Sequence, residues 1–198
     1  FNVSDLSLAS VSPLVEAALR LVALPTTRLT RPDVLGVLTH PAVRGGVAEV
    51  EGPEWVALTE RLGIFHGLDA RAHEGTYLAG AAGPSWEQGL SRIALGAFMR
   101  GPRSGETRFV EVGGRRYLPE EPPVGERGDA HFALLVRSLT SDVRFAQRAR
   151  CSLSEWSRFL VALLQAYLTP SDEREEAALR QALAALEGLR ALDLEGAA

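Results

Sequence analysis

The chain has 198 residues, of which 46% are hydrophobic and 23% are charged, and its formal net charge is −4. This composition is typical of one soluble globular domain, excludes an intrinsically disordered chain and argues against a strongly basic nucleic-acid-binding module. No apolar run reaches the roughly 20 residues that a membrane-spanning helix needs, so we expect no membrane contact. The chain begins at Phe1 without a signal-peptide pattern, and we expect it to be a piece of a longer protein.

All 21 basic residues are arginines. The lack of lysine excludes a P-loop, which needs a lysine for the β- and γ-phosphates, and also excludes Schiff-base chemistry, so we predict no cofactor. Cys151 is the only cysteine, which rules out an internal disulfide and zinc sites with several cysteine ligands. A reducing cytoplasm is the simplest location for such a chain.

Helical patterns dominate, and capping signals mark where the helices begin. Ser12-Pro13, Thr30 with Asp33, Ser85 with Gln88, and Ser152 with Glu155 each have the form of a helix start. Residues 63–84 lack periodicity and are predicted to be an ordered loop. The predicted helices cover residues 14–24, 31–40, 53–62, 86–98, 129–143, 153–167 and 171–189.

One region favours β-structure. Residues 107–112 and 115–118 are rich in β-forming residues and flank Gly113-Gly114, the signature of a tight hairpin. We therefore predict a mainly α fold, a single helical domain over residues 1–198, with a hairpin insertion at about 101–128.

Positive charge gathers around this hairpin. Residues 100–150 hold ten arginines and seven acids, whereas residues 171–198 hold three arginines and seven acids. One interpretation is a mosaic of solvated faces. The other is that five arginines contact DNA phosphates: Arg100, Arg103, Arg108, Arg115 and Arg116.

No catalytic residue is predicted. His66, Asp69, His73 and Glu74 are metal-ligand types, but their spacing matches no known site, so loop hydrogen bonding is favoured and no metal is predicted. Ser85 lacks the Gly-x-Ser-x-Gly pattern of a nucleophile, and no histidine partner is indicated for Cys151.

Two further features are open to two interpretations. Ile64 and Phe65 could form an apolar loop tip that docks a partner, or they could pack in the core. The three tryptophans could stack on unpaired bases, but tryptophans near helix starts more often anchor packing: Trp55, Trp86 and Trp156.

The order of short segments resembles the gamma subunit (RecC) family of exodeoxyribonuclease V. The similar segments include Ser12–Val15, Leu24-Pro25, Arg28–Thr30, Gly67–Asp69, Ser85-Trp86 with Gly89, Arg92 and Gly96, and Leu153–Trp156. The resemblance covers nearly the whole chain, and it departs from the family's pattern at residues 64–67.

The resemblance implies a non-catalytic accessory domain of the superfamily 1 helicase-like type, at the position called 2B. The parent complex would be an ATP-dependent helicase–nuclease of double-strand break repair and recombination. Its partners would be DNA, bound weakly by this piece alone, and the sister helicase–nuclease subunits.

Three hypotheses follow. The first is a DNA-handling and scaffolding domain, and the second is a protein–protein module without DNA contact. The third is a metal-dependent hydrolase built on His66, Asp69 and His73.

Overall fold

A computed structural model describes residues 12–43, 48–79, 84–98, 109–120 and 128–195. Within these ranges the chain forms seven α-helices, two 3-10 turns and one antiparallel hairpin, which confirms the mainly helical prediction. No described helix is both long and apolar enough to cross a bilayer. Backbone contacts group the chain into two units, which we call unit 1 (residues 1–26, 36–50 and 145–198) and unit 2 (residues 27–35 and 51–144).

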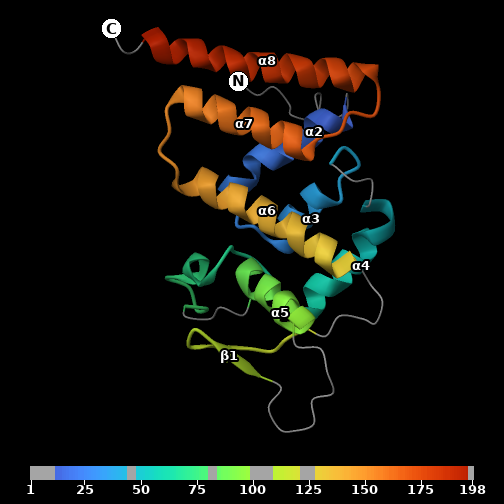
Figure 1. The fold of residues 1–198 in the computed structure, drawn as a ribbon, viewed down its shortest axis with the longest axis vertical. Helices are drawn as coiled ribbons and strands as arrows, with labels where there is room; N and C mark the ends of the chain where they lie inside the picture. Colours follow the sequence, from blue (N-terminus) through green and yellow to red (C-terminus); the bar gives the residue numbers. More distant parts are fainter. Residues whose placement is uncertain (1–11, 44–47, 80–83, 99–108, 121–127, 196–198) are drawn as a thin grey trace. The chain divides into compact units, whose positions relative to one another are not determined.

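Unit 1 contains three full helices, α2 (Pro13–Ala23), α7 (Leu153–Tyr167) and α8 (Glu173–Glu195), and the 3-10 turn η1 (Leu24–Thr26). Helices α7 and α8 lie side by side and run in opposite directions (Figure 1). A β-bridge between Val43 and Leu168 ties the start of the α7–α8 connection to the segment before α4. The apolar core of this unit includes Leu14, Ala17, Leu21, Leu163, Leu164 and Tyr167.

The predicted start of α2 is confirmed, because the helix begins at Pro13 directly after Ser12. Ser12 occupies the N-cap position, but its hydroxyl makes no capping bond and instead donates to Oε1 of Glu175 at 3.3 Å. The same oxygen accepts the backbone N–H of Leu14 at 3.1 Å. A carboxylate from another helix therefore caps α2, where a negative charge also suits the positive end of the helix dipole.

Unit 2 is built from α5 (Trp86–Phe98), the turn η2 (Ala70–His73) and the hairpin strands β1 (Val110–Val112) and β2 (Arg115–Tyr117). It also holds the larger parts of α4 (Ala48–Arg61) and α6 (Gly128–Arg148), and the first residues of α3 (Arg31–Leu38). Buried residues recur on one face of α6 at helical spacing: Phe132, Val136, Leu139 and Val143. Trp55 of α4 packs on Phe132, with the ring centroids 5.4 Å apart.

Two predicted boundaries are wrong. Helix α4 was expected to begin near Pro53, but it is helical from Ala48, with Pro53 inside it. Pro53 lacks an N–H to donate, so this position forfeits one helical hydrogen bond that the surrounding turns must make up for. The second strand also ends at Tyr117 and not at the predicted Leu118, because pairing extends only from Val110–Tyr117 to Val112–Arg115. Residues 107 and 108 of the predicted first strand lie outside the described residues.

The described part of the predicted loop, residues 63–79 and 84, contains only the short turn η2, and one tryptophan fixes the base of the loop. Trp86 is fully buried, and its indole Nε1 donates to the carbonyl of Leu29 at 2.8 Å. The Gly67 N–H donates to the neighbouring carbonyl of Arg28 at 3.0 Å. Leu29 has a φ of +53°, a strained value for a leucine, which these two neighbouring contacts help to hold in place.

Candidate nucleic-acid interface

The hairpin turns at two glycines in the left-handed region. Gly113 and Gly114 have φ values of +58° and +74°, which match the two-residue turn predicted from the sequence. Tyr117 of β2 is buried, and β2 contacts α5. The hairpin is therefore anchored through one face to α5, and the remaining side chains of its strands reach solvent.

The two described arginines of the hairpin have different surroundings. Arg115 has a side chain that is 51% exposed, and its Nη1 lies 3.8 Å from Oε2 of Glu87 on α5. The guanidinium of Arg116 lies over the ring of Phe109, 5.8 Å from its centroid. Glu111 is the cross-strand partner of Arg116, so one carboxylate shares this small sheet with two cations. Both arginines are available to solvent and to anions.

The half-buried guanidinium of Arg92 holds the residues that follow β2. Nε of Arg92 donates to the carbonyl of Leu118 at 2.6 Å, and Nη1 donates to the carbonyl of Leu62 at 2.7 Å. Nη2 lies 3.2 Å from Oε2 of Glu120, whose other oxygen accepts a hydrogen bond from Nε of Arg61 at 3.0 Å. This Arg92 clamp joins the end of α4, helix α5 and the hairpin exit, so it limits how far the hairpin can swing.

Backbone contact reinforces the clamp. The Glu120 N–H donates to the Arg92 carbonyl at 3.0 Å. A Cβ added to Gly96 would lie 1.6 Å from the Glu120 carbonyl oxygen, so only glycine permits this approach.

The other predicted phosphate ligands, Arg100, Arg103 and Arg108, lie outside the described residues. At the predicted docking tip, Ile64 and Phe65 differ in exposure. Ile64 is 1% exposed and lies where a Cβ on Gly89 would be 2.4 Å from its Cδ1, so it belongs to the core. Phe65 is 60% exposed, with the guanidinium of Arg31 over its ring at 5.6 Å, and it alone remains a docking candidate.

The structure brings His66 and His73 together. Their ring centroids are 4.6 Å apart, and both ring nitrogens of the fully buried His73 have no hydrogen-bond partner among the described residues. Burial lowers the pKa of His73, and His66 lowers it further, although Asp69 acts in the opposite direction. His73 is therefore neutral at pH 7.

Asp69 faces other partners. Its Oδ1 accepts the Arg71 N–H at 3.0 Å, and its Oδ2 lies 3.5 Å from Nη2 of Arg144. Within the described ranges, no three histidine, cysteine, aspartate or glutamate side chains converge to hold a metal ion. The loop hydrogen bonding favoured from the sequence describes Asp69 correctly.

The two nucleophile candidates have structural surroundings. Ser85 is buried, and its Oγ accepts the Gln88 N–H at 3.4 Å at the start of α5. Cys151 is a free, half-buried thiol between α6 and α7.

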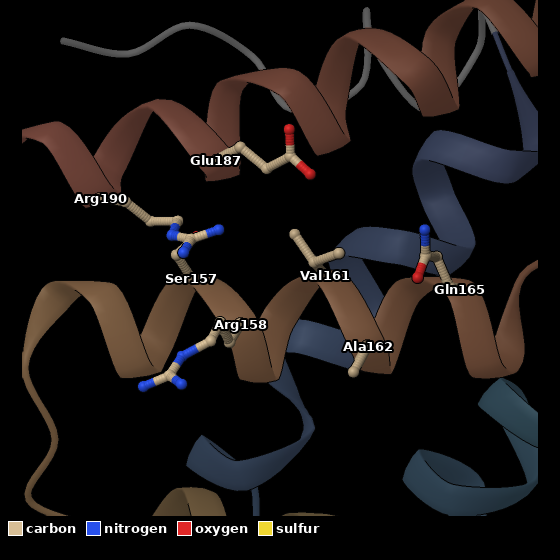
Figure 2. Close-up of a pocket in the computed structure, with 7 residues that line it drawn as sticks. All are labelled: Ser157, Arg158, Val161, Ala162, Gln165, Glu187 and Arg190. Carbon is tan, nitrogen blue, oxygen red and sulfur yellow. The ribbon is translucent and has the colours of Figure 1, made fainter.

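A small hollow lies between α7 and α8 (Figure 2). Its volume is about 130 Å³, below the roughly 300–1,000 Å³ of ordinary small-molecule sites. Glu187 reaches into it from α8 and Val161 from α7, whereas Arg158 points away from α8 (Figure 2). The hollow can take little more than one amino-acid side chain.

Sequence comparison identifies the family. The family model for the fourth domain of the RecBCD enzyme subunit RecC matches residues 11–197. The chain belongs to the RecC fourth-domain family. It is 29% identical over 185 residues to the RecBCD enzyme subunit RecC of Escherichia coli (strain K12), which covers 89% of this chain. It spans only 15% of the length of that relative.

Several residues that carry the resemblance to RecC have packing roles here. Trp86 anchors the loop base, Arg92 forms the clamp, and Gly96 allows the approach of Glu120. Trp86 was also predicted to anchor packing from its position at a helix start, whereas Arg92 and Gly96 were indicated only by the resemblance. Sequence reasoning missed Glu120 as a partner of Arg92, because nothing in the local pattern pairs residues 28 positions apart.

Proposed function

We propose that this RecC fourth domain is a non-catalytic DNA-handling and scaffolding module of a RecC-like subunit, acting in double-strand break repair and recombination. The observation that carries the proposal is the exposed Arg115–Arg116 pair on a hairpin that the Arg92 clamp holds in place. Family membership supplies the context, because the relative is named as a subunit of the RecBCD enzyme.

The physics of the contact is electrostatic. Guanidinium groups bind phosphate oxygens and fix the position of DNA, but such contacts carry no sequence information. Because the chain as a whole has a net charge of −4, we expect weak binding that falls steeply as salt rises.

The scaffolding role assigns the chemistry to neighbours. ATP turnover and strand cleavage would belong to the sister helicase–nuclease subunits, and this piece would sit at the 2B-type accessory position of a helicase-like half. The lysine-free sequence fits this division, since no P-loop is present.

The test measures duplex DNA binding by the 198-residue chain, using fluorescence anisotropy of labelled DNA at a series of salt concentrations. Replacing both hairpin arginines (Arg115→Gln with Arg116→Gln) is expected to weaken binding and to lower the salt slope by about 2, roughly one unit per phosphate contact. The matched control replaces two exposed arginines of the acidic helix α8, Arg174 and Arg180, by glutamine. Equal losses in both double variants would show that overall charge, not the hairpin, determines binding.

Phe65 supports a second candidate, a protein-docking role. An aromatic ring that is 60% exposed and lies under an arginine has the composition of an interface hot spot. Replacing Phe65 by Ser is expected to weaken capture of the sister subunits and to leave DNA binding unchanged. If capture is unaffected, this role is excluded.

A further inference from the structure

Trp156, for which base stacking and packing were both open from the sequence, lies in a cluster of three aromatic rings where α6 meets α7. We call Phe145, Trp156 and Phe159 the aromatic corner. The Phe145 centroid lies 4.7 Å from that of Phe159 and 6.2 Å from that of Trp156, and the last two are 5.8 Å apart. All three residues belong to unit 1.

The aromatic corner reaches the surface. Phe145 is 44% exposed, and Trp156 and Phe159 are each half-buried. The other two tryptophans are covered, because Trp55 is 2% exposed and Trp86 is 0% exposed. Trp156 is therefore the only indole of the chain with substantial access to solvent.

The segment that carries Trp156 and Phe159 is rich in arginine. Residues 145–169 hold three arginines and a single acid, Glu155. The Glu155 carboxylate accepts the Ser152 N–H at 2.9 Å in the capping box of α7, so it is already engaged. The arginines are all exposed, and among the described residues no ion pair involves two of them, Arg150 and Arg158.

We propose that the aromatic corner binds unpaired bases of single-stranded DNA, with the nearby arginines on the phosphates. Ring faces stack on any base, and guanidinium groups follow the backbone, which is the usual combination for single strands. Bases within a duplex are already stacked on each other, so this surface discriminates against paired DNA. The inference rests on the proposed function only in that the chain handles DNA, and it uses a different unit from the hairpin.

Trp156 reports its own occupancy. The experiment titrates the 198-residue chain with a thymidine oligonucleotide of about 12 nucleotides and follows tryptophan emission. We expect saturable quenching that weakens as salt rises, no quenching with a blunt duplex of equal length, and loss of the signal in Trp156→Phe.

Substitutions define the site. Phe145→Ala is expected to weaken oligonucleotide binding about 5- to 150-fold, the range for one lost stacking contact. If the alanine variant unfolds, Phe145→Leu replaces it, because leucine keeps most of the apolar volume but has no ring to stack on a base. Arg150→Gln with Arg158→Gln is expected to weaken binding as well. The matched controls are Phe65→Leu, which changes an exposed ring of unit 2, and Arg174→Gln with Arg180→Gln.

The outcomes separate this proposal from the first one. If the Arg115–Arg116 double variant loses duplex binding but keeps the quenching by the oligonucleotide, both sites stand. Absent quenching, equal quenching by the duplex, or unchanged affinity in the folded Phe145→Leu variant would overturn the aromatic corner. Acrylamide quenching of Trp156 emission gives a further check. If the sister subunits protect Trp156 from acrylamide and the oligonucleotide does not, the aromatic corner is a protein interface and the proposal is overturned.

Discussion

The Glu175 carboxylate accepts the backbone N–H of Leu14 at 3.1 Å, although the two residues lie 161 positions apart. Its second oxygen accepts both the N–H and the hydroxyl of Ser171, at 2.9 and 2.8 Å. Glu175 is only 5% exposed, so each of these bonds is largely shielded from competing water. One side chain therefore joins the first turn of α2 to the first turn of α8.

We expect Glu175→Gln to lower the free energy of unfolding by about 1–3 kcal/mol, because an amide NH₂ group would face donors at one of its two ends. Urea denaturation measures the change. The control is Glu173→Gln, which removes the same charge from an exposed position of the same helical turn and should change stability by less than about 0.5 kcal/mol.

This contribution also depends on pH. Burial alone would raise the pKa of Glu175, but the hydrogen bonds from Ser171, Leu14 and Ser12 outweigh burial and bring the pKa below its usual 4.5. The stabilisation is present above about pH 4.5 and disappears as the pH falls through the folded-state pKa. The stability difference between the wild-type chain and Glu175→Gln should therefore shrink below pH 4.5, and a constant difference would contradict this assignment.

His73 gives a second pH dependence at a higher range. Because its pKa is lowered from 6.5, the unfolded chain takes up the proton first, and unit 2 should lose stability as the pH falls below about 6.5. His73→Leu removes the titrating group and keeps a similar volume. The melting temperature should fall less between pH 7 and pH 5 for this variant than for the wild-type chain. Equal falls in the two proteins would contradict the prediction.

Gly96 and Gly188 offer a matched pair of helical glycines. A Cβ on Gly96 would lie 1.6 Å from the Glu120 carbonyl, whereas nothing lies within 4 Å of a Cβ on Gly188. We expect Gly96→Ala to cost about 1–3 kcal/mol through overpacking. Gly188→Ala should stabilise α8 by about 0.5–1 kcal/mol through its better helix propensity, and a change of the same sign in both would refute the close approach.

Glu111 tests the electrostatics of the hairpin. As the cross-strand partner of Arg116, it places a negative charge where we propose a phosphate. Glu111→Gln should raise duplex DNA affinity by up to about five-fold at low salt, the equivalent of the ~0.2–1 kcal/mol of exposed charge pairs. The gain should fade at high salt, whereas Glu173→Gln on α8 should give none.

Local signals carried much of the fold. The Ser152–Glu155 capping box forms reciprocally, Thr30 and Asp33 exchange bonds at the start of α3, and Gly113-Gly114 makes the predicted turn. Each is decided by residues within a few positions of one another, so a short window contains the whole cause.

Contacts between residues far apart in the chain could not be predicted from such local patterns. The sequence indicated Ser12 as an N-cap, but no nearby residue indicates that its hydroxyl donates to Glu175 or that Arg92 pairs with Glu120. The candidate site shows the same limit, because its charges could be located along the chain while their surroundings depend on tertiary packing. Arg115 and Arg116 stay predictions as phosphate ligands.

The Leu14–Glu175 bond also has a consequence for synthesis on the ribosome. At about 5–20 residues per second, roughly 10–30 s separate the translation of these two residues. During that interval α2 is without the carboxylate that caps it, while both segments of unit 2, residues 27–35 and 51–144, have already been translated. The bond that caps α2 therefore forms only after all of unit 2 has been translated, and until then chaperones would meet α2 with its N-terminal end uncapped.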